Sequence, residues 1–175
     1  MSSKTRSAFR NRLEYGAVRT ALWLFTRLPA RVVFWITDRC GDVAYRLDVR
    51  HRAVAEANVA RVFAGELDGL EVKALVRRVF RNFLRVAAEL AMLPAELERR
   101  GLRDVIDIRG EEHVRQAFGS GKGVIVYSAH LGNWEAIAAA GEPLAMKLHS
   151  VGRAMDNPLL DRLLIAHRSR YARSV

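Results

Sequence analysis

A stripe of apolar residues at helical spacing runs through the middle of the sequence and predicts a long helix. Its members recur every three or four positions, and they are Val72, Val76, Val79, Phe80, Phe83, Leu84, Ala87 and Leu90. Asp68 and Glu71 have the spacing of a capping box, which predicts where the helix begins, and Pro94 predicts where it ends. Basic residues recur every four positions on another side of this helix, and they are Lys73, Arg77, Arg81 and Arg85. This basic row suits either a solvated helix face or a contact with an anionic partner.

The sequence before this stripe is also helical in pattern, and one apolar stretch in it bears on membrane attachment. The stretch covers residues 21–36. It is interrupted by Arg27, Pro29 and Arg31, whereas a membrane-spanning helix needs about 20 consecutive apolar residues. A charge near the bilayer centre costs about 3 kcal/mol, and no signal-peptide cleavage site follows the stretch. We therefore expect a helical, membrane-associating region over residues 1–100 that lies at the membrane interface without crossing it.

The hydrophobic period changes in the second half of the chain. Three short apolar segments predict strands, at residues 105–109, 124–127 and 148–152. Predicted helices separate them, and strands that alternate with helices form βαβ units with a largely parallel sheet. We therefore expect an α/β fold, in which the helical N-terminal region leads into a mostly parallel sheet over residues 101–175. Three strands make a thin sheet, so we expect one domain whose α/β core is truncated and lacks its C-terminal half.

Composition narrows the classes of partner. The 175 residues include 29 lysines and arginines against 19 aspartates and glutamates, which gives a formal net charge of +10. Such a balance favours an anionic partner, for example a nucleic acid, a membrane surface or an acidic protein. Cys40 is the single cysteine, so the chain forms neither an intramolecular disulfide nor a thiolate metal site. The histidines outside the motif lack ligand spacing, so we expect no metal; they are His51, His113, His149 and His167.

The segment from Ser128 to Glu135 carries residue types that can activate an alcohol. His130 and Glu135 are five residues apart, and on a straight helix their side chains would diverge by about 500° of rotation. They can meet only where the chain bends, and Gly132 permits a bend at a strand-to-helix turn. A histidine can take the proton of a hydroxyl group, and a carboxylate can fix the tautomer of that histidine. The sequence therefore offers His130 as a general base and Glu135 as its orienting partner.

Alternative interpretations of these residues are open at this point. Arg153 is a candidate donor to a developing oxyanion, but it also suits an ordinary surface position. A histidine beside a carboxylate is often a structural pair, and Asn133 suits a helix cap. Ser128 lacks the Gly-x-Ser-x-Gly elbow of many serine hydrolases. The Gly121-Lys122-Gly123 turn lacks the spacing of a P-loop.

The segment from His130 to Glu135 is similar to the H-x4-E block of the lipid A biosynthesis acyltransferases, the lauroyl and myristoyl transferases. Two further blocks match at the distance usual in this family, namely Val151-Gly152-Arg153 and Asp156-Asn157-Pro158, of which the second also has the pattern of a helix start. The glycine turn and apolar run at 121–128 resemble the family as well. The resemblance covers residues 25–171. Members of the family are longer than this chain.

The resemblance implies a fold of the glycerolipid acyltransferase type. It also implies transfer of a fatty acyl group from an acyl carrier protein thioester to a hydroxyl of a lipid A precursor. The reaction would occur at the cytoplasmic face of the inner membrane, with the protein peripheral or interfacial on an anionic surface. His130 would be the general base and Glu135 its partner. Arg153 would hold the oxyanion or the substrate, and Asn133 would support the site, with neither a metal nor a cofactor.

Other functions compete with this one. Related acyltransferases that act on mannosylated phosphatidylinositol share an H-x4-D or H-x4-E block, and Glu135 favours the lipid A branch. An inactive, truncated and membrane-associated remnant would keep the fold without turnover. A nucleic-acid-binding protein fits the charge of +10. However, the sequence has no helix-turn-helix, zinc finger or RNA-binding motif, so we expect no nucleic-acid partner.

Overall fold

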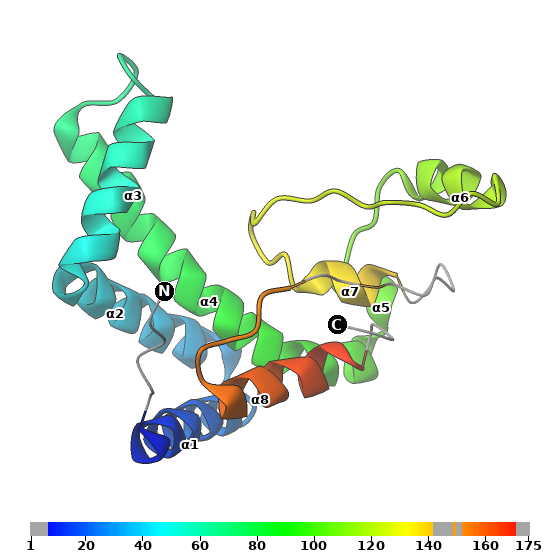
Figure 1. Ribbon diagram of the computed structural model, residues 1–175, viewed down its shortest axis with the longest axis horizontal. Coiled ribbons are helices and arrows are strands. Elements are labelled where there is room, and N and C mark those ends of the chain that lie inside the picture. Colours follow the sequence, from blue (N-terminus) through cyan, green and yellow to red (C-terminus); the bar gives the residue numbers. More distant parts are fainter. Residues whose placement is uncertain (1–6, 142–148, 150–151, 171–175) are drawn as a thin grey trace. The chain divides into compact units, whose positions relative to one another are not determined.

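The computed structural model describes residues 7–141, 149 and 152–170, and within these residues the regular secondary structure consists of α-helices (Figure 1). The helices are α1 Ala8–Phe25, α2 Ala30–Leu47, α3 Val49–Val62, α4 Gly69–Arg100, α5 Leu102–Val105, α6 Glu111–Gly119, α7 Ala136–Ala140 and α8 Pro158–Arg168. The chain packs as two compact units, of which one is residues 24–92 and the other combines 1–23 with 93–175. The domain boundary expected between residues 100 and 101 stays a prediction.

The sheet expected over residues 101–175 is absent from the part of the chain that the structure describes, so the α/β prediction was wrong. Val105 ends the short helix α5 instead of starting a strand. Residues 124–127 form an irregular segment in which Ile125 is 99% exposed. A strand is stabilised by hydrogen bonds to a neighbouring strand, and no described segment pairs with this one. The third predicted strand, 148–152, lies mostly outside the described residues.

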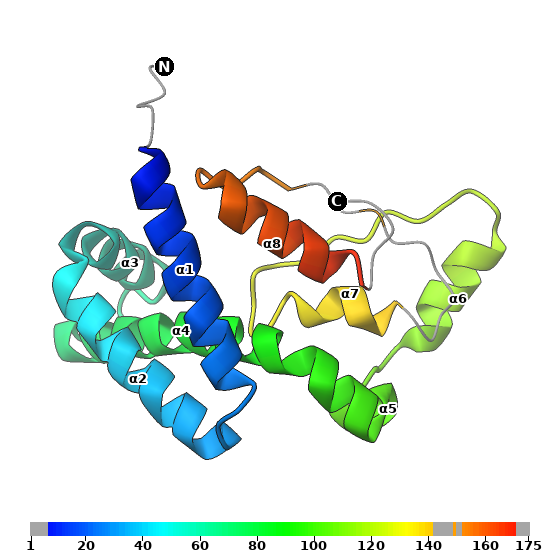
Figure 2. The same ribbon diagram turned by 90° about the horizontal axis from the view of Figure 1, so that it is seen from below.

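The unit formed by residues 24–92 contains α2, α3 and most of α4, and α2 and α3 both lie along α4 in Figures 1 and 2. Its core includes Val33 of α2 and Val76 of α4, both fully buried. Gly41 allows the two helices to approach closely. A Cβ atom at this position would lie 2.6 Å from the Cα atom of Arg81, which is closer than side-chain and backbone carbons can pack.

The start of α4 follows the sequence prediction, whereas its end does not. Asp68 accepts hydrogen bonds from the backbone of Leu70 and Glu71 at 2.7 and 2.8 Å, and Glu71 accepts one from the backbone of Asp68 at 2.9 Å. This reciprocal pair confirms the capping box. Pro94 lies inside α4 and does not end it. A proline removes one backbone donor, and the helix here continues past that loss until Gly101, which has a φ of +82°.

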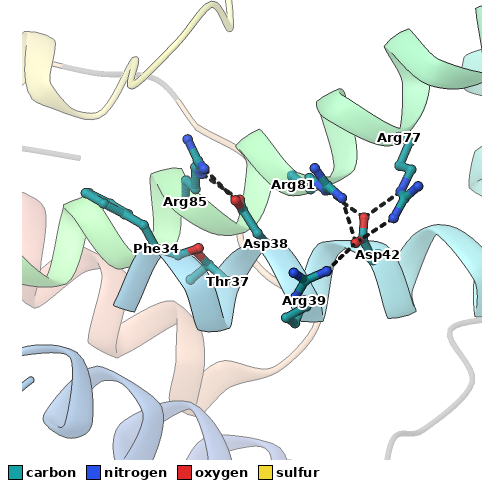
Figure 3. Close-up of polar contacts among 8 residues, drawn as sticks. All are labelled: Phe34, Thr37, Asp38, Arg39, Asp42, Arg77, Arg81 and Arg85. Carbon is teal, nitrogen blue, oxygen red and sulfur yellow. Dashed lines mark hydrogen bonds and ion pairs between the residues drawn. The ribbon is translucent and has the colours of Figure 1, made fainter. Parts of the chain in front are cut away.

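Three of the four basic residues of the row on α4, the arginines, pair with carboxylates of α2 (Figure 3), whereas Lys73 is exposed. Asp42 accepts two hydrogen bonds from Arg77, both at 2.7 Å, and two from Arg81, at 2.6 and 2.7 Å. One turn earlier on α2, Asp38 accepts two from Arg85 at 2.6 and 2.5 Å. We refer to these three arginines and two aspartates as the arginine–aspartate seam, and it joins α2 to α4.

In the other unit, Asn157 joins the start of α8 to α1. Asn157 accepts a hydrogen bond from the backbone of Leu159 at 3.0 Å and so caps α8, with Pro158 in the first turn. This confirms the helix start predicted from the sequence. The side-chain amide of the buried Asn157 also donates to the backbone carbonyl of Asn11 and to the carboxylate of Glu14, both at 3.0 Å. One buried side chain therefore satisfies groups on two helices.

No helix within the described residues combines the length and the apolar character that crossing a membrane requires. The apolar stretch at 21–36 is divided between two helices, because α1 ends at Phe25 and α2 begins at Ala30.

Candidate active site

His130 lies in the irregular segment that leads from α6 to α7, and its side chain is exposed. Its imidazole ring contacts the indole ring of Trp134, with 4.9 Å between the ring centroids and 54° between the ring planes. Gly132, between these two residues in the sequence, has a φ of +55°. This left-handed conformation is the bend that the sequence predicts at this glycine. The chain therefore bends between the histidine and the start of α7.

Glu135 lies at the N-terminus of α7, and an arginine from α8 holds its carboxylate. Arg168 donates to this carboxylate through Nε at 2.8 Å and through Nη2 at 2.5 Å, in the two-pronged geometry that guanidinium groups favour. The indole Nε1 of Trp134 donates a third hydrogen bond to it at 3.1 Å. The Arg168 hydrogen bonds hold the pKa of Glu135 below its ordinary value, against the opposing effect of partial burial. Glu135 is therefore a carboxylate at neutral pH.

Trp134 contacts both His130, the candidate base, and Glu135, its candidate partner, and no hydrogen bond that the structure describes joins these two residues directly. Within the described residues, the hydrogen bonds of Glu135 come from Arg168 and Trp134, and His130 contacts Trp134 through its ring. The indole ring is therefore in contact with the histidine, while its N–H is bonded to the glutamate. One aromatic side chain thus contacts both the candidate base and its candidate partner.

Arg153 and Asn133 occupy different surroundings. The guanidinium group of Arg153 is largely exposed, and its Nη2 lies 3.3 Å from a carboxylate oxygen of Asp156. It lines an open pocket of about 400 Å³, together with Asn157 and Leu160 among others. Asn133 is half-buried, and its backbone carbonyl accepts a hydrogen bond from Ala136 at 3.2 Å. The pocket brings a cationic donor close to acidic groups and leaves room for a polar ligand.

Arg168 is the residue of this region that the sequence analysis missed. The Glu135 carboxylate was expected to face a histidine, and an arginine 33 residues later holds it instead. A weak signal was available, because the helix that begins at Asn157 must bring its own basic residues near the preceding helix if the two helices pack together. The sequence alone does not say which of the basic residues of α8 fills that role.

A second histidine lies in the same unit. Burial holds the pKa of His167 below its ordinary value, and the nearby positive charge of Arg170 acts in the same direction. This imidazole is therefore neutral at neutral pH. Across the described ranges, no three histidine, cysteine, aspartate or glutamate side chains gather closely enough to hold a metal ion.

Comparisons with known proteins give one match. Residues 4–175 match the profile of a family described as bacterial lipid A biosynthesis acyltransferase. No significant match was found among curated proteins, and none was found among solved structures. The matched range covers nearly the whole chain, including both helical units and every residue of the His130 to Glu135 segment.

Proposed function

The chain belongs to the bacterial lipid A biosynthesis acyltransferase family, and from this membership we propose that it transfers a fatty acyl group from an acyl carrier protein thioester to a hydroxyl of a lipid A precursor. The family itself is one of acyltransferases, which take an acyl donor and a lipid acceptor. The match over residues 4–175 is the observation that carries the proposal. The H-x4-E spacing of His130 and Glu135 also supports it, because these residue types can activate a hydroxyl group.

In the proposed reaction, His130 takes the proton of the acceptor hydroxyl as the oxygen attacks the thioester carbonyl carbon. A C–O bond forms and the carbonyl oxygen becomes an oxyanion. When that intermediate collapses, the C–S bond breaks and the leaving thiolate takes the proton back from the imidazolium. The exposed position of His130 favours this role, because an acceptor that belongs to a lipid must be able to reach the base.

Glu135 and Arg153 have supporting roles in this proposal. Glu135 helps to orient the histidine through Trp134, which donates a hydrogen bond to the carboxylate and contacts the imidazole ring. The guanidinium of Arg153 supplies the donor for the oxyanion or for an anionic group of the substrate, and Asn133 supports the site. The exposure of Arg153 and the pocket beside it are consistent with contact to a substrate.

We place the proposed reaction at the cytoplasmic face of the inner membrane, with the protein peripheral to the bilayer. The formal net charge of +10 favours both an anionic bilayer and an acidic carrier protein. A lipid acceptor also requires that the site meet the membrane surface.

The test is acyl transfer from an acyl carrier protein thioester to a lipid A precursor, with the wild-type chain and two histidine variants. His130→Ala is expected to lower the rate by roughly 100- to 10,000-fold, because general-base catalysis contributes about that much. His113→Ala is the matched control, since His113 is an exposed histidine on α6 outside the motif. It is expected to keep the wild-type rate. Circular dichroism checks that each variant folds.

Two results would overturn the proposal. A folded His130→Ala protein with near-wild-type transfer would exclude the histidine as the base. A wild-type chain that transfers no acyl group to this acceptor, under conditions where a longer member of the family does, would exclude the transfer activity for this chain.

A further inference from the structure

Exposed side chains gather on one side of α2, from the start of the helix to its end. The exposed positions include Arg31, Val32, Trp35, Val43, Arg46 and Leu47. At about 100° of rotation per residue, these positions fall within one half of the helix circumference. The buried residues Val33, Thr37 and Gly41 lie on the opposite half, whereas the buried Asp42, which α4 binds, lies at the edge of the exposed half. We call the exposed half the outer face of α2.

The outer face combines large apolar side chains with positive charge. Trp35 is 60% exposed and Leu47 is 76% exposed, and Val32 and Val43 lie on the same half. Arg31 and Arg46 are exposed too, and the guanidinium of Arg39 lies over the Trp35 ring at 5.7 Å from its centroid. A soluble helix normally presents polar residues on its exposed side, so apolar residues there indicate an interaction surface.

The negative charges of α2 neutralise this face only in part, because Arg39 lies 3.8 Å from Asp42 while Arg31 and Arg46 are exposed. The two acidic residues of the helix are Asp38 and Asp42, and both are engaged by arginines of α4 in the arginine–aspartate seam. Asp42 is buried, and four hydrogen bonds from two guanidinium groups reach its carboxylate. The arginines of the outer face therefore keep a positive field toward the solvent.

We propose that the outer face of α2 binds the surface of an anionic lipid bilayer, with the helix parallel to the membrane plane. This inference rests on the membrane location in the proposed function and names the surface responsible. Amphipathic helices of this kind place apolar residues at the boundary of headgroups and acyl chains, while arginines reach the lipid phosphates. Tryptophan is the side chain most typical of that boundary.

The shape and charge of the face favour a bilayer over a protein partner. The exposed half of a straight helix is convex and offers no groove for another chain. Its apolar residues run from Val32 near the start of α2 to Leu47 at its end, with arginines between them. A planar, anionic and deformable surface can contact all of them at once, whereas a rigid protein would need a complementary groove of the same length.

The charge on the face is tested by flotation of the whole chain with lipid vesicles. Wild-type protein is expected to float with vesicles that contain phosphatidylglycerol and to stay behind with vesicles of phosphatidylcholine alone. The variant Arg31→Gln with Arg46→Gln is expected to bind the anionic vesicles roughly 25-fold less, since each basic residue near such a surface contributes about fivefold. Both arginines are exposed and neither forms a side-chain hydrogen bond or ion pair among the described residues, so the fold should be kept.

The control variant removes two positive charges elsewhere. Arg109→Gln with Lys122→Gln changes the net charge by the same amount at two exposed positions in the other unit. It is expected to bind anionic vesicles within about twofold of wild type. Equal losses from the two double variants would show that net charge alone drives binding, and this would overturn the proposal.

The apolar contribution is tested in the same assay. Val43→Ser with Leu47→Ser is expected to lower vesicle binding at least tenfold, by an amount consistent with the area these side chains would bury in the bilayer. Val62→Ser with Leu70→Ser is the matched control, because these side chains are similarly exposed but lie on α3 and at the start of α4. The control is expected to bind as wild type does.

The possible failures differ from one another. Wild-type protein that does not float with anionic vesicles would overturn both this inference and the membrane location, without bearing on acyl transfer to a dispersed acceptor. Strong vesicle binding that the α2 variants keep would leave the location standing and exclude this face. A change in oligomeric state of the α2 variants by light scattering, with vesicle binding unchanged, would identify a second copy of the chain as the occupant and overturn the proposal.

Discussion

The arginine–aspartate seam and the segment from Gly123 to Glu135 show two different relations between sequence and contacts. In the seam, every arginine meets a carboxylate of another helix through two hydrogen bonds. In the segment, Ile125 and Tyr127 are almost fully exposed, and the exposed His130 contacts its sequence neighbour Trp134. Apart from Glu135, which Arg168 and Trp134 hold, the side chains named in this segment have fewer partners than those that join the two helices.

The difference follows from the spacing of residues. Asp38 and Asp42 are one helical turn apart on α2, and the arginines that meet them recur at the same interval on α4. Two helices that pack lengthwise bring such rows into register. An apolar run such as 124–127 has no comparable rule, because its partner would have to come from another segment whose position the run does not determine. A helical pattern therefore specifies its own contacts better than a strand pattern does.

Removal of Asp42 is expected to have the largest effect on folding stability. Asp42→Ala would leave Arg77 and Arg81 facing each other without the carboxylate that separates them. We expect the free energy of unfolding to fall by roughly 2–4 kcal/mol. The full cost of an unpaired buried charge is not reached, because the two arginine side chains are 42% and 31% exposed and water can solvate them. Chemical denaturation at neutral pH measures the change.

The matched control and the pH dependence sharpen this prediction. Asp107→Ala also removes a carboxylate that pairs with an arginine, but both partners there are exposed, and no loss of stability is expected. The hydrogen bonds from Arg77 and Arg81 hold the pKa of Asp42 far below its ordinary value of 3.8. Its stabilisation should therefore be complete above about pH 4 and be lost as the pH falls further. A stability difference between wild type and Asp42→Ala that grows with acidity would contradict the assignment.

A smaller effect is expected at the proposed site, where a single arginine holds Glu135. Arg168→Gln would take away two charge-assisted hydrogen bonds from a carboxylate that is partly buried. The free energy of unfolding is expected to fall by about 1–2 kcal/mol at neutral pH. The pKa of Glu135 is expected to rise, because Arg168 is the main cause of its depression. Carboxylate titration by nuclear magnetic resonance measures that rise.

The control for this position is another arginine of α8. Arg162→Gln removes a charge from an exposed position of the same helix, and neither the stability nor the pKa of Glu135 should change. Because the pKa of Glu135 is depressed in the folded chain, its stabilisation is present above its ordinary value of 4.5 and is lost as the pH falls below that value. The difference between wild type and Arg168→Gln should therefore disappear in acid.

Most of the helical half could be predicted from the sequence, because periodicity and capping residues act locally. Asp68 and Glu71 predicted the start of α4, and Asn157 with Pro158 predicted the start of α8. Pro94 misled, because a proline removes one hydrogen bond but does not end a helix whose neighbouring bonds persist.

The sheet and the surroundings of the motif could not be predicted in the same way. An apolar run shows that a segment tends to be extended or buried, but not which segment pairs with it. The partner of Glu135 likewise depends on how α7 and α8 pack, which no local pattern specifies. Asp38 and Asp42 could have been found, since their spacing of four matches that of the arginines of α4. The roles of His130, Glu135, Arg153 and Asn133 in catalysis stay predictions.

The smallest change in the free energy of unfolding is expected at Ile125, the residue that differs most in exposure from the core of the helical unit. This side chain is 99% exposed, whereas Val76 in the core of the helical unit is fully buried. Ile125→Ser should therefore change the free energy of unfolding by less than about 0.5 kcal/mol, the usual range for an exposed substitution. Val76→Ala, which removes fewer carbon atoms, should cost about 2 kcal/mol, because it takes buried methyl groups from a packed core. Both are measured by chemical denaturation under the same conditions.

A loss above about 1 kcal/mol for Ile125→Ser would show that residues 124–127 pack against other parts of the folded chain. In that case the contrast drawn between the helical seam and this segment would be wrong.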